Sequence, residues 1–366
     1  MLTHADDYPL HQTAEPMAFA GTDRNFYDRF FFNGYSADGS LFFACALGVY
    51  PQLNVMDASF SFSLGGRQYN LRASKEMLGD RLNLEIGPIR VEIVRPFEET
   101  RIVIADDESG LTADITATGR HFPIEEPRFT RRQSNRVLMD ITRATQNVDW
   151  QGAVSVNGES HDVAACRGTR DRSWGVRQVG AAEAQPLAPA IEPQFFWLWT
   201  PVNLQTATFF CHTNDNADGT SWNKKAVLHD IAADAKHEWG RPQFKQTYAM
   251  GTRRLTGLEI TADGLHAEFS TFGQLFYMQG IGYTHPAWNH GTHHGPLRVG
   301  HDVIELDEAE TALRAGQMDY IHVQSLASVT LEAHGKAHTG VGVMEQFFLG
   351  PHAPSGFTDM LDKIVE

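Results

Sequence analysis

Alternation of apolar and polar residues with a period of two runs through most of this 366-residue chain. Such alternation is typical of antiparallel strands that bury one face, and long helical periodicity is nearly absent. Dipeptides that form tight hairpin turns separate several of the alternating runs: Gly65-Gly66, Asn157-Gly158, Asp218-Gly219 and Asp263-Gly264. We therefore expect an all-β fold with about eight strands in each half of the chain, which is the number that two small closed barrels use.

The chain is too long for one typical core, so two domains are expected. Residues 181–193 are rich in alanine and proline and are the best candidate for a linker. An apolar run predicts a strand at 41–50, and alternation predicts strands at 55–64, 111–118 and 322–333; further strands are expected at 137–142, 151–156 and 255–261. The predicted organisation is an N-terminal arm over 1–23, one β-barrel over 24–180, a second over 181–350 and a C-terminal tail over 351–366.

Composition excludes several classes of partner and location. The formal charge is 30 minus 45, or −15, which gives no electrostatic support to nucleic-acid binding. Three separated cysteines, Cys45, Cys166 and Cys211, predict no disulfide framework and favour a reducing cytoplasm. The N-terminus lacks the features of a secretory signal, and no apolar run approaches the ~20 residues of a membrane span. The many aromatic residues can line an apolar cavity or fill the two cores.

The ten residues from Gly168 to Arg177 carry the strongest chemical signal. They place three arginines, one carboxylate and one indole between two glycines, a composition unlike that of a typical strand. Asp171, held among guanidinium groups, is expected to stay ionised, while Trp174 offers a flat apolar wall. This combination suits a pocket for an apolar ligand with one polar end. A structural corner held by ion pairs has the same residue types and is the alternative.

A second cluster lies in a loop, where five of the seventeen histidines fall between His285 and His301. His290 with His293 or His294 would be the ligands of a metal site, but no glutamate lies inside the loop. An acid/base role for His290 beside an apolar cavity is the favoured interpretation, because histidine titrates near neutral pH. A solvent-facing His-rich loop remains the third reading.

Glu345 precedes an apolar run near the end of the last strong β region and is a further candidate acid, because burial would raise its pKa. No GxSxG elbow, P-loop or dinucleotide-binding GxGxxG motif is present. Serine-nucleophile hydrolysis, phosphoryl transfer and nicotinamide redox chemistry are therefore not expected, and no cofactor is predicted.

The stretch Arg170-Asp171-Arg172-Ser173-Trp174-Gly175-Val176-Arg177 resembles a signature of the AttH-like and carotenoid 1,2-hydratase (hydroxyneurosporene synthase) superfamily. The early stretch from Tyr27-Asp28-Arg29 to Tyr50–Asp57 resembles its uncharacterised bacterial members, as does Pro286 to Gly291, and the likeness spans most of the chain. The resemblance implies two tandem lipocalin-like antiparallel barrels around a ligand-sized cavity. It also implies hydration of an isoprenoid double bond, or cyclisation of a polyene, without a redox cofactor.

The sequence thus predicts a cofactor-independent lyase, isomerase or cyclase that acts on a hydrophobic terpenoid, steroid-like or polyketide molecule. Asp171 is the acid or the residue that orients it; if arginines keep Asp171 ionised, the acid is His290 or Glu345. The predicted substrate-binding residues are Arg170, Trp174, Arg177, Tyr283 and Trp288. A non-catalytic carrier of hydrophobic molecules and a metal-dependent enzyme that uses the His285–His301 loop are the alternatives. A homodimer is left open.

Overall fold

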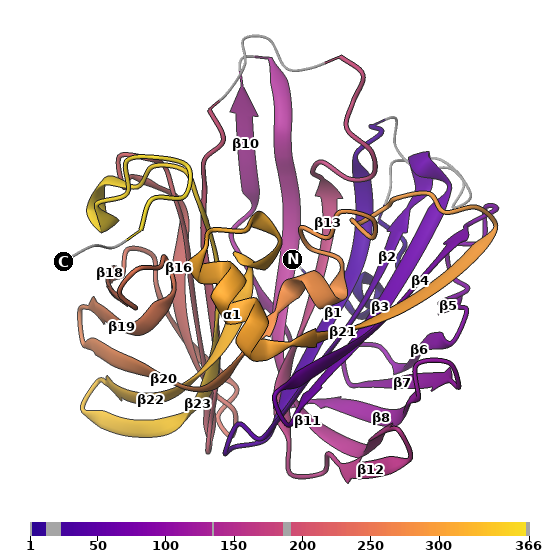
Figure 1. Cartoon of the computed structure of the whole chain (residues 1–366). Helices are drawn as coiled ribbons and strands as arrows, with labels where there is room; N and C mark the ends of the chain where they lie inside the picture. The colour runs from indigo at the N-terminus through magenta and orange to yellow at the C-terminus, as the bar shows by residue number, and fades with distance from the viewer. Residues whose placement is uncertain (1, 12–22, 134, 186–191, 364–366) are drawn as a thin grey trace. The chain divides into compact units, whose positions relative to one another are not determined.

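The computed structural model describes residues 2–11, 23–133, 135–185 and 192–363 (Figure 1). The chain divides into two compact units. The first unit consists of Met1–Ala182 together with Gln279–Ile304, and the second consists of Glu183–Met278 together with Glu305–Glu366. The first sheet therefore receives a segment, 279–304, that follows most of the second unit in the chain. The predicted linker at 181–193 lies partly outside the described residues.

The first unit is one antiparallel sheet that curls until it nearly closes (Figure 1). Along its main path the strands follow the order β21-β4-β3-β2-β1-β13-β11-β8-β7-β6-β5, and β5 and β6 at one end come back beside β3. Its strands are β1 (Phe26–Tyr35), β2 (Leu41–Tyr50), β3 (Val55–Leu64), β4 (Arg67–Glu76), β5 (Glu85–Ile86), β6 (Ile89–Arg95), β7 (Glu99–Asp106), β8 (Leu111–Gly119), β9 (Ile124–Glu125), β10 (Phe129–Gln133), β11 (Arg136–Val156), β12 (Glu159–Asp162), β13 (Arg167–Val176) and β21 (Leu297–Glu305). Short 3-10 helices lie at His4–Asp7, Pro51–Leu53 and Met278–Ile281.

Local turn chemistry fixes the register of the early hairpins. Gly65 and Gly66 have φ values of 60° and 85°, and they join β3 to β4 with Leu64 opposite Arg67. Asn157 and Gly158, at 52° and 85°, join β11 to β12 in the same way. Both central residues of such a turn need positive φ, which glycine and asparagine adopt most easily. The hairpins predicted from these dipeptides are therefore confirmed.

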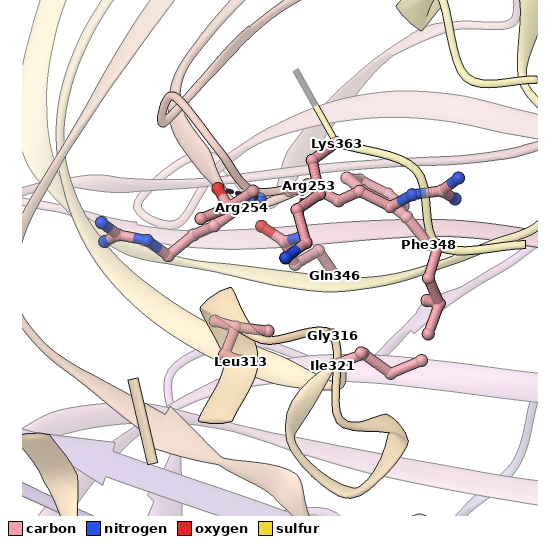
Figure 2. A pocket seen from close by; sticks show the side chains of 10 residues that line it. Arg253, Arg254, Leu313, Gly316, Ile321, Gln346, Phe348 and Lys363 are labelled. Atoms are coloured by element: carbon pink, nitrogen blue, oxygen red, sulfur yellow. Dashed lines mark hydrogen bonds between the residues drawn. The ribbon is translucent and has the colours of Figure 1, made fainter. Parts of the chain in front are cut away.

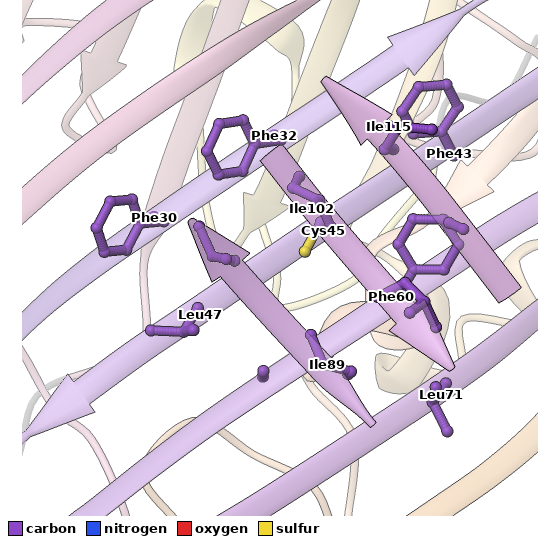
Figure 3. Close-up of a cluster of buried hydrophobic side chains, with 14 of the residues drawn as sticks. Phe30, Phe32, Phe43, Cys45, Leu47, Phe60, Leu71, Ile89, Ile102 and Ile115 are labelled. Carbon is purple, nitrogen blue, oxygen red and sulfur yellow. The ribbon is translucent and has the colours of Figure 1, made fainter. Parts of the chain in front are cut away.

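The inside of the first sheet is filled by the protein's own side chains. Figure 3 shows Phe30, Phe32 and Phe60 from the long strands pointing toward Ile102 and Ile115 of the strands that cross them. Ring contacts continue through this cluster, for example between Phe43 and Trp150 at 4.9 Å. The aromatic residues of this region thus contribute to a buried core, which is one of the two roles that the sequence allows them.

Two strands differ from the sequence prediction. β11 runs unbroken through 21 residues, where two separate strands were expected. The Gly168–Arg177 region was not predicted as a strand, yet β13 lies at the centre of the sheet and pairs with both β1 and β11. Pairing on both edges satisfies its backbone, and this outweighs the weak strand propensity of its arginines, aspartate and glycines.

The second unit is an antiparallel half-barrel with the strand order β17-β16-β15-β14-β23-β22-β20-β19-β18. Its core contains Phe196, Phe209 and Phe348. Its elements are β14 (Phe195–Leu204), β15 (Ala207–Asp215), β16 (Ser221–Asp230), β17 (Ala235–Trp239), β18 (Gln243–Tyr248), β19 (Leu255–Ala262), β20 (Leu265–Tyr277), α1 (Leu306–Arg314), β22 (Val323–Ala333) and β23 (Lys336–Leu349), with 3-10 turns at Met318–Tyr320 and Ala353–Ser355. The predicted all-β class is confirmed. Throughout the described chain, no helix has both the length and the apolarity to cross a membrane.

Candidate functional site

Strand β13 divides the predicted arginine cluster between two faces of the first sheet. Successive side chains of a strand point to opposite faces. Arg170 and Arg172 lie on the inner face, where they stack on core phenylalanines. Asp171 lies on the outer face, where it meets Arg143 of β11. The sequence cluster is therefore two separate groups of residues.

On the outer face, Asp171 is buried and paired with a cation. Its carboxylate forms an ion pair with Arg143, which also lies 3.5 Å from Glu126. The Tyr27 hydroxyl, on β1, interacts electrostatically with both Asp171 and Arg143. Burial raises the pKa of Tyr27, although the neighbouring Arg177 works against this rise. Asp171 therefore sits as a fixed negative charge at one end of an outer-face polar network.

The loop after the Met278–Ile281 turn brings His290 to the same network. Arg177 lies over the ring of Tyr27, with 4.5 Å between the guanidinium carbon and the ring centroid, and its terminal nitrogen is 3.1 Å from Nδ1 of His290. A guanidinium group can only donate, so Nδ1 accepts and the ring hydrogen is on Nε2. Nε2 then donates to the carbonyl of Ile281 at 3.1 Å. His290 is therefore held as a neutral ring that positions Arg177.

The network continues to a carboxyl group that the sequence did not single out. The Tyr50 hydroxyl donates to Oδ1 of Asp57 at 3.0 Å, and the backbone N–H of Gly291 donates to Oδ2 at 2.7 Å. Arg29 lies 3.5 Å from the same hydroxyl and faces the ring of Tyr283 at 5.2 Å. This series of side-chain contacts ends at His290, whose ring centroid lies 4.2 Å from that of Tyr283.

Gly48 makes this arrangement possible. A Cβ atom at this position would lie 2.2 Å from the Tyr50 hydroxyl, closer than any real contact. The missing side chain therefore lets the hydroxyl lie flat over β2, between Arg29 and Asp57. Gly48 lies directly opposite Asp57 in the β2–β3 pairing, so the space above Gly48 is next to the Asp57 carboxyl group.

The pKa of Asp57 shifts in the opposite direction from those of Asp28, Asp114 and Asp302, which lie below their usual value. Burial of its carboxyl group raises the pKa of Asp57, and this outweighs the opposing effect of Arg29, Gly291 and Tyr50. The pKa of Tyr50 lies well above its usual value because its hydroxyl is buried and lies beside Asp57. A half-buried carboxyl group with a raised pKa holds its proton longer than an ordinary aspartate and is suited to give it away.

The inner-face group has a different occupant, the N-terminal segment of the chain. Arg170 forms an ion pair with the buried carboxylate of Asp7, and the ring of Trp174 stacks on that of His11 at 3.4 Å. Asp28 lies 2.7 Å from Arg172 and 2.9 Å from His11. Arg170 and Trp174, predicted to bind a substrate, thus contact this segment in the structure.

The remaining predicted residues lie elsewhere. Trp288 packs over Gly300 and lies 4.3 Å from the ring of His294, inside the loop itself. Glu345 belongs to the second unit, where it is buried. Its carboxylate accepts hydrogen bonds there from Trp197 and Gln324 and contacts Nε2 of His322 at 2.8 Å. In the parts of the chain that the structure describes, no three His, Cys, Asp or Glu residues gather in a way that would hold a metal ion.

Among the described residues, the second unit contains two pockets, each with charged side chains along an otherwise mixed lining. The first, between Arg253, Gln346 and Lys363 (Figure 2), has a volume of about 20 Å³, which is room for a single water molecule. The second is an open groove of about 370 Å³ on the outside of the half-barrel, with Lys245, Glu259 and Glu268 along it. Neither pocket contains a residue that the sequence singled out. The outer face of the first sheet brings four of them into one network, so it is the better candidate site.

Sequence reasoning gave no site role to four outer-face residues, although all four lie in the early stretch of the resemblance: Tyr27, Arg29, Tyr50 and Asp57. The available signal was in β3, where Asp57 is the charged residue of a strand that otherwise alternates apolar residues with serine. On the inner face it missed Asp7 and His11, because no local pattern marks which residues of an N-terminal segment return to the sheet.

Comparison with known proteins supports the fold. A family model described as a family of unknown function (DUF8625) matches residues 2–358. A candidate AttH protein from Nitrosomonas europaea has 14% identity and a TM-score of 0.52, over 92% of this chain and 97% of that one. Kievitone hydratase from Nectria haematococca has 11% identity and a TM-score of 0.48, over 87% and 88%. CghA has 10% identity and a TM-score of 0.49, over 94% and 95%. No curated protein matches the chain. The predicted resemblance to AttH-like proteins is thus confirmed for the fold.

Proposed function

Because the chain belongs to the family DUF8625, whose function is unknown, we propose an activity from its own geometry. We propose that the protein is a cofactor-independent lyase, isomerase or cyclase that transfers a proton to a carbon–carbon double bond of a small hydrophobic substrate. The observation that carries this proposal is the half-buried Asp57 carboxyl group with its raised pKa. The resemblance of the sequence to the carotenoid hydratase superfamily supports the same class of reaction.

The charges around Asp57 narrow the substrate class. Arg29 and Arg177 lie in the same network, and two guanidinium groups disfavour a carbocation nearby. They suit an oxygen atom that becomes negative during the reaction. An oxygenated, polyketide-like substrate with a double bond conjugated to a carbonyl group therefore fits better than a plain hydrocarbon. The rings of Tyr27 and Tyr283 supply the apolar contacts.

A balanced reaction follows from these groups. A nucleophile, either water or another part of the substrate, forms a bond to the far carbon of the double bond, and the π electrons move toward the carbonyl oxygen. Arg29 and Arg177 stabilise the enolate oxygen, and Asp57 gives its proton to the near carbon. The proton lost by the nucleophile returns to the Asp57 carboxylate. Tyr50 orients the carboxyl group, and His290 positions Arg177.

The test begins with organic extraction of the purified protein and mass spectrometry of whatever small molecules co-purify. These compounds are then incubated with the protein in D₂O. We expect product with one deuterium on the carbon next to the carbonyl group, retained through a brief neutral work-up in H₂O. Asp57→Asn is expected to slow its formation by about 100-fold or more, because general acid catalysis contributes on this scale.

Asp114→Asn is the control, because Asp114 is an exposed carboxylate of the same sheet, paired with Arg101. This variant is expected to keep the wild-type rate. Equal rates in wild type and Asp57→Asn would exclude Asp57 as the acid. A tightly bound compound that wild type never converts would instead identify the protein as a carrier of hydrophobic molecules.

A further inference from the structure

The segment Thr3–His11 binds as an intramolecular ligand to the inner face of the first sheet, at Arg170 and Trp174 of β13. We call this place the inner-face end. Three buried arginines converge on the segment. The guanidinium of Arg170 takes both oxygens of the Asp7 carboxylate, Arg172 donates to the carbonyl of Tyr8 at 3.1 Å, and Arg81 donates to the carbonyl of His11 at 3.3 Å. Burying each of these arginine side chains costs desolvation free energy, so three of them on one short segment are unusual.

The carboxylate of Asp7 sits in a built anion site. Its Oδ2 accepts the backbone N–H of Phe97 at 2.5 Å, and Phe97 has a φ of 58°, a left-handed conformation unusual for a phenylalanine. The Arg170 guanidinium lies 5.3 Å from the centroids of both Phe32 and Phe97, so apolar rings shape its plane. Strain of this kind persists where surrounding structure enforces it, and it clusters at ligand sites.

The other end of the segment rests on an aromatic platform. His11 lies face to face on Trp174 with an interplanar angle of 10°. Its Nδ1 is 2.9 Å from Asp28 and its Nε2 is 3.1 Å from Asp6. Trp174 is half-buried with His11 stacked on its ring. The imidazole of His11 thus occupies the place that a ligand's aromatic ring would take, and the carboxylate of Asp7 occupies the place of a ligand's acid group.

We propose that this inner-face end is a binding site for a small aromatic carboxylate, which competes with the Thr3–His11 segment for Arg170 and Trp174. The acid group of the ligand replaces Asp7 in the bidentate pair, and its ring replaces His11 on the indole. The site lies on the inner face of the first sheet, whereas Asp57 lies on the outer face. The proposal therefore does not depend on the proposed enzymatic activity. A tethered segment competes at an effective concentration in the millimolar range, so the intact protein binds the ligand weakly.

The first test uses the double variant Asp7→Ala/His11→Ala and phenylbutyrate as the probe. Calorimetric titration is expected to show binding at least about ten-fold tighter than in wild type, because the competitor is gone. The neutral amide of phenylbutyrate should not bind. Adding Arg170→Met to the double variant should abolish binding of the acid. Equal affinity for acid and amide, or binding that survives Arg170→Met, would overturn the proposal.

A second measurement on the intact protein keeps the proposal falsifiable if the variant folds poorly. Amide hydrogen exchange of residues 4–8, Leu10 and Phe97 is measured with and without phenylbutyrate at increasing concentration. The bonds of these amides include Tyr8 N–H to Ala5 and Phe97 N–H to Asp7. We expect their exchange to accelerate about ten-fold or more as the segment is displaced. Unchanged exchange at concentrations far above the millimolar range would contradict the proposal.

Discussion

Gly175→Ala is expected to destabilise the protein by about 4 kcal/mol or more, although the change adds a single methyl group. Gly175 has a φ of 133°, which side chains rarely adopt, and a Cβ atom there would lie 2.1 Å from the carbonyl oxygen of Asp140. That oxygen belongs to the backbone of the neighbouring strand β11 and cannot move aside. Two central strands would have to separate, so the cost exceeds ordinary backbone strain.

Chemical denaturation of wild type and two variants measures this effect. Gly65→Ala is the matched control, because Gly65 also has positive φ, at 60°, but nothing lies within 4 Å of its added Cβ. Strain alone is expected to cost Gly65→Ala about 1–2 kcal/mol. If the two variants lose the same free energy of unfolding, close packing at Gly175 is not the reason for this glycine.

Arg172→Met is expected to cost about 3–5 kcal/mol at neutral pH, because it leaves the carboxylate of Asp28 buried without its cation. Both side chains are fully buried, and their charged atoms lie 2.7 Å apart. Arg128→Met serves as control, since the Arg128–Asp140 pair has similar geometry but Arg128 is exposed. An exposed pair contributes about 0–1 kcal/mol. The double variant Asp28→Asn/Arg172→Met is expected to recover part of the loss.

The effect of Arg172→Met has a definite pH dependence. Burial alone would raise the pKa of Asp28, but Arg172 and His11 outweigh burial and hold it below the usual 3.8. In wild type, this contribution to stability is present above the unfolded pKa and is lost as pH falls through the lower folded value. In the variant, burial raises the pKa, so the stability difference should shrink on acidification. A difference that stays constant between neutral pH and pH ~3 would contradict this account.

The features of the fold that could be predicted from the sequence are those set by neighbouring residues, namely turns and strands. Turn dipeptides such as Gly65-Gly66 set the register of neighbouring strands. A continuous apolar run identified β2, and period-two alternation identified β3, both with their correct bounds. β13 was not recognised as a strand because charged side chains occupy both of its faces, and only its neighbours β1 and β11 show why each face accepts them.

The candidate site was predicted in part, for a related reason. Asp171, Arg177, Tyr283 and His290 belong to the outer-face network, whereas Asp57 was overlooked, because a lone acid on a strand's polar face looks solvent-exposed in sequence. What makes Asp57 unusual is the return of the 279–304 segment, whose Gly291 donates to it across more than 200 residues. Contacts of that sequence separation leave no periodic signal.

Asp57 is expected to keep its proton at pH values where an ordinary aspartate is charged. Carbon-13 NMR of the Asp57 side-chain carboxyl group, followed through a pH titration, tests this directly. We predict a midpoint above the ordinary 3.8, and a further rise in Tyr50→Phe, because Tyr50 stabilises the charged form. A midpoint at or below 3.8 in the wild-type protein would show that Asp57 is an ordinary carboxylate and would contradict its role as the acid.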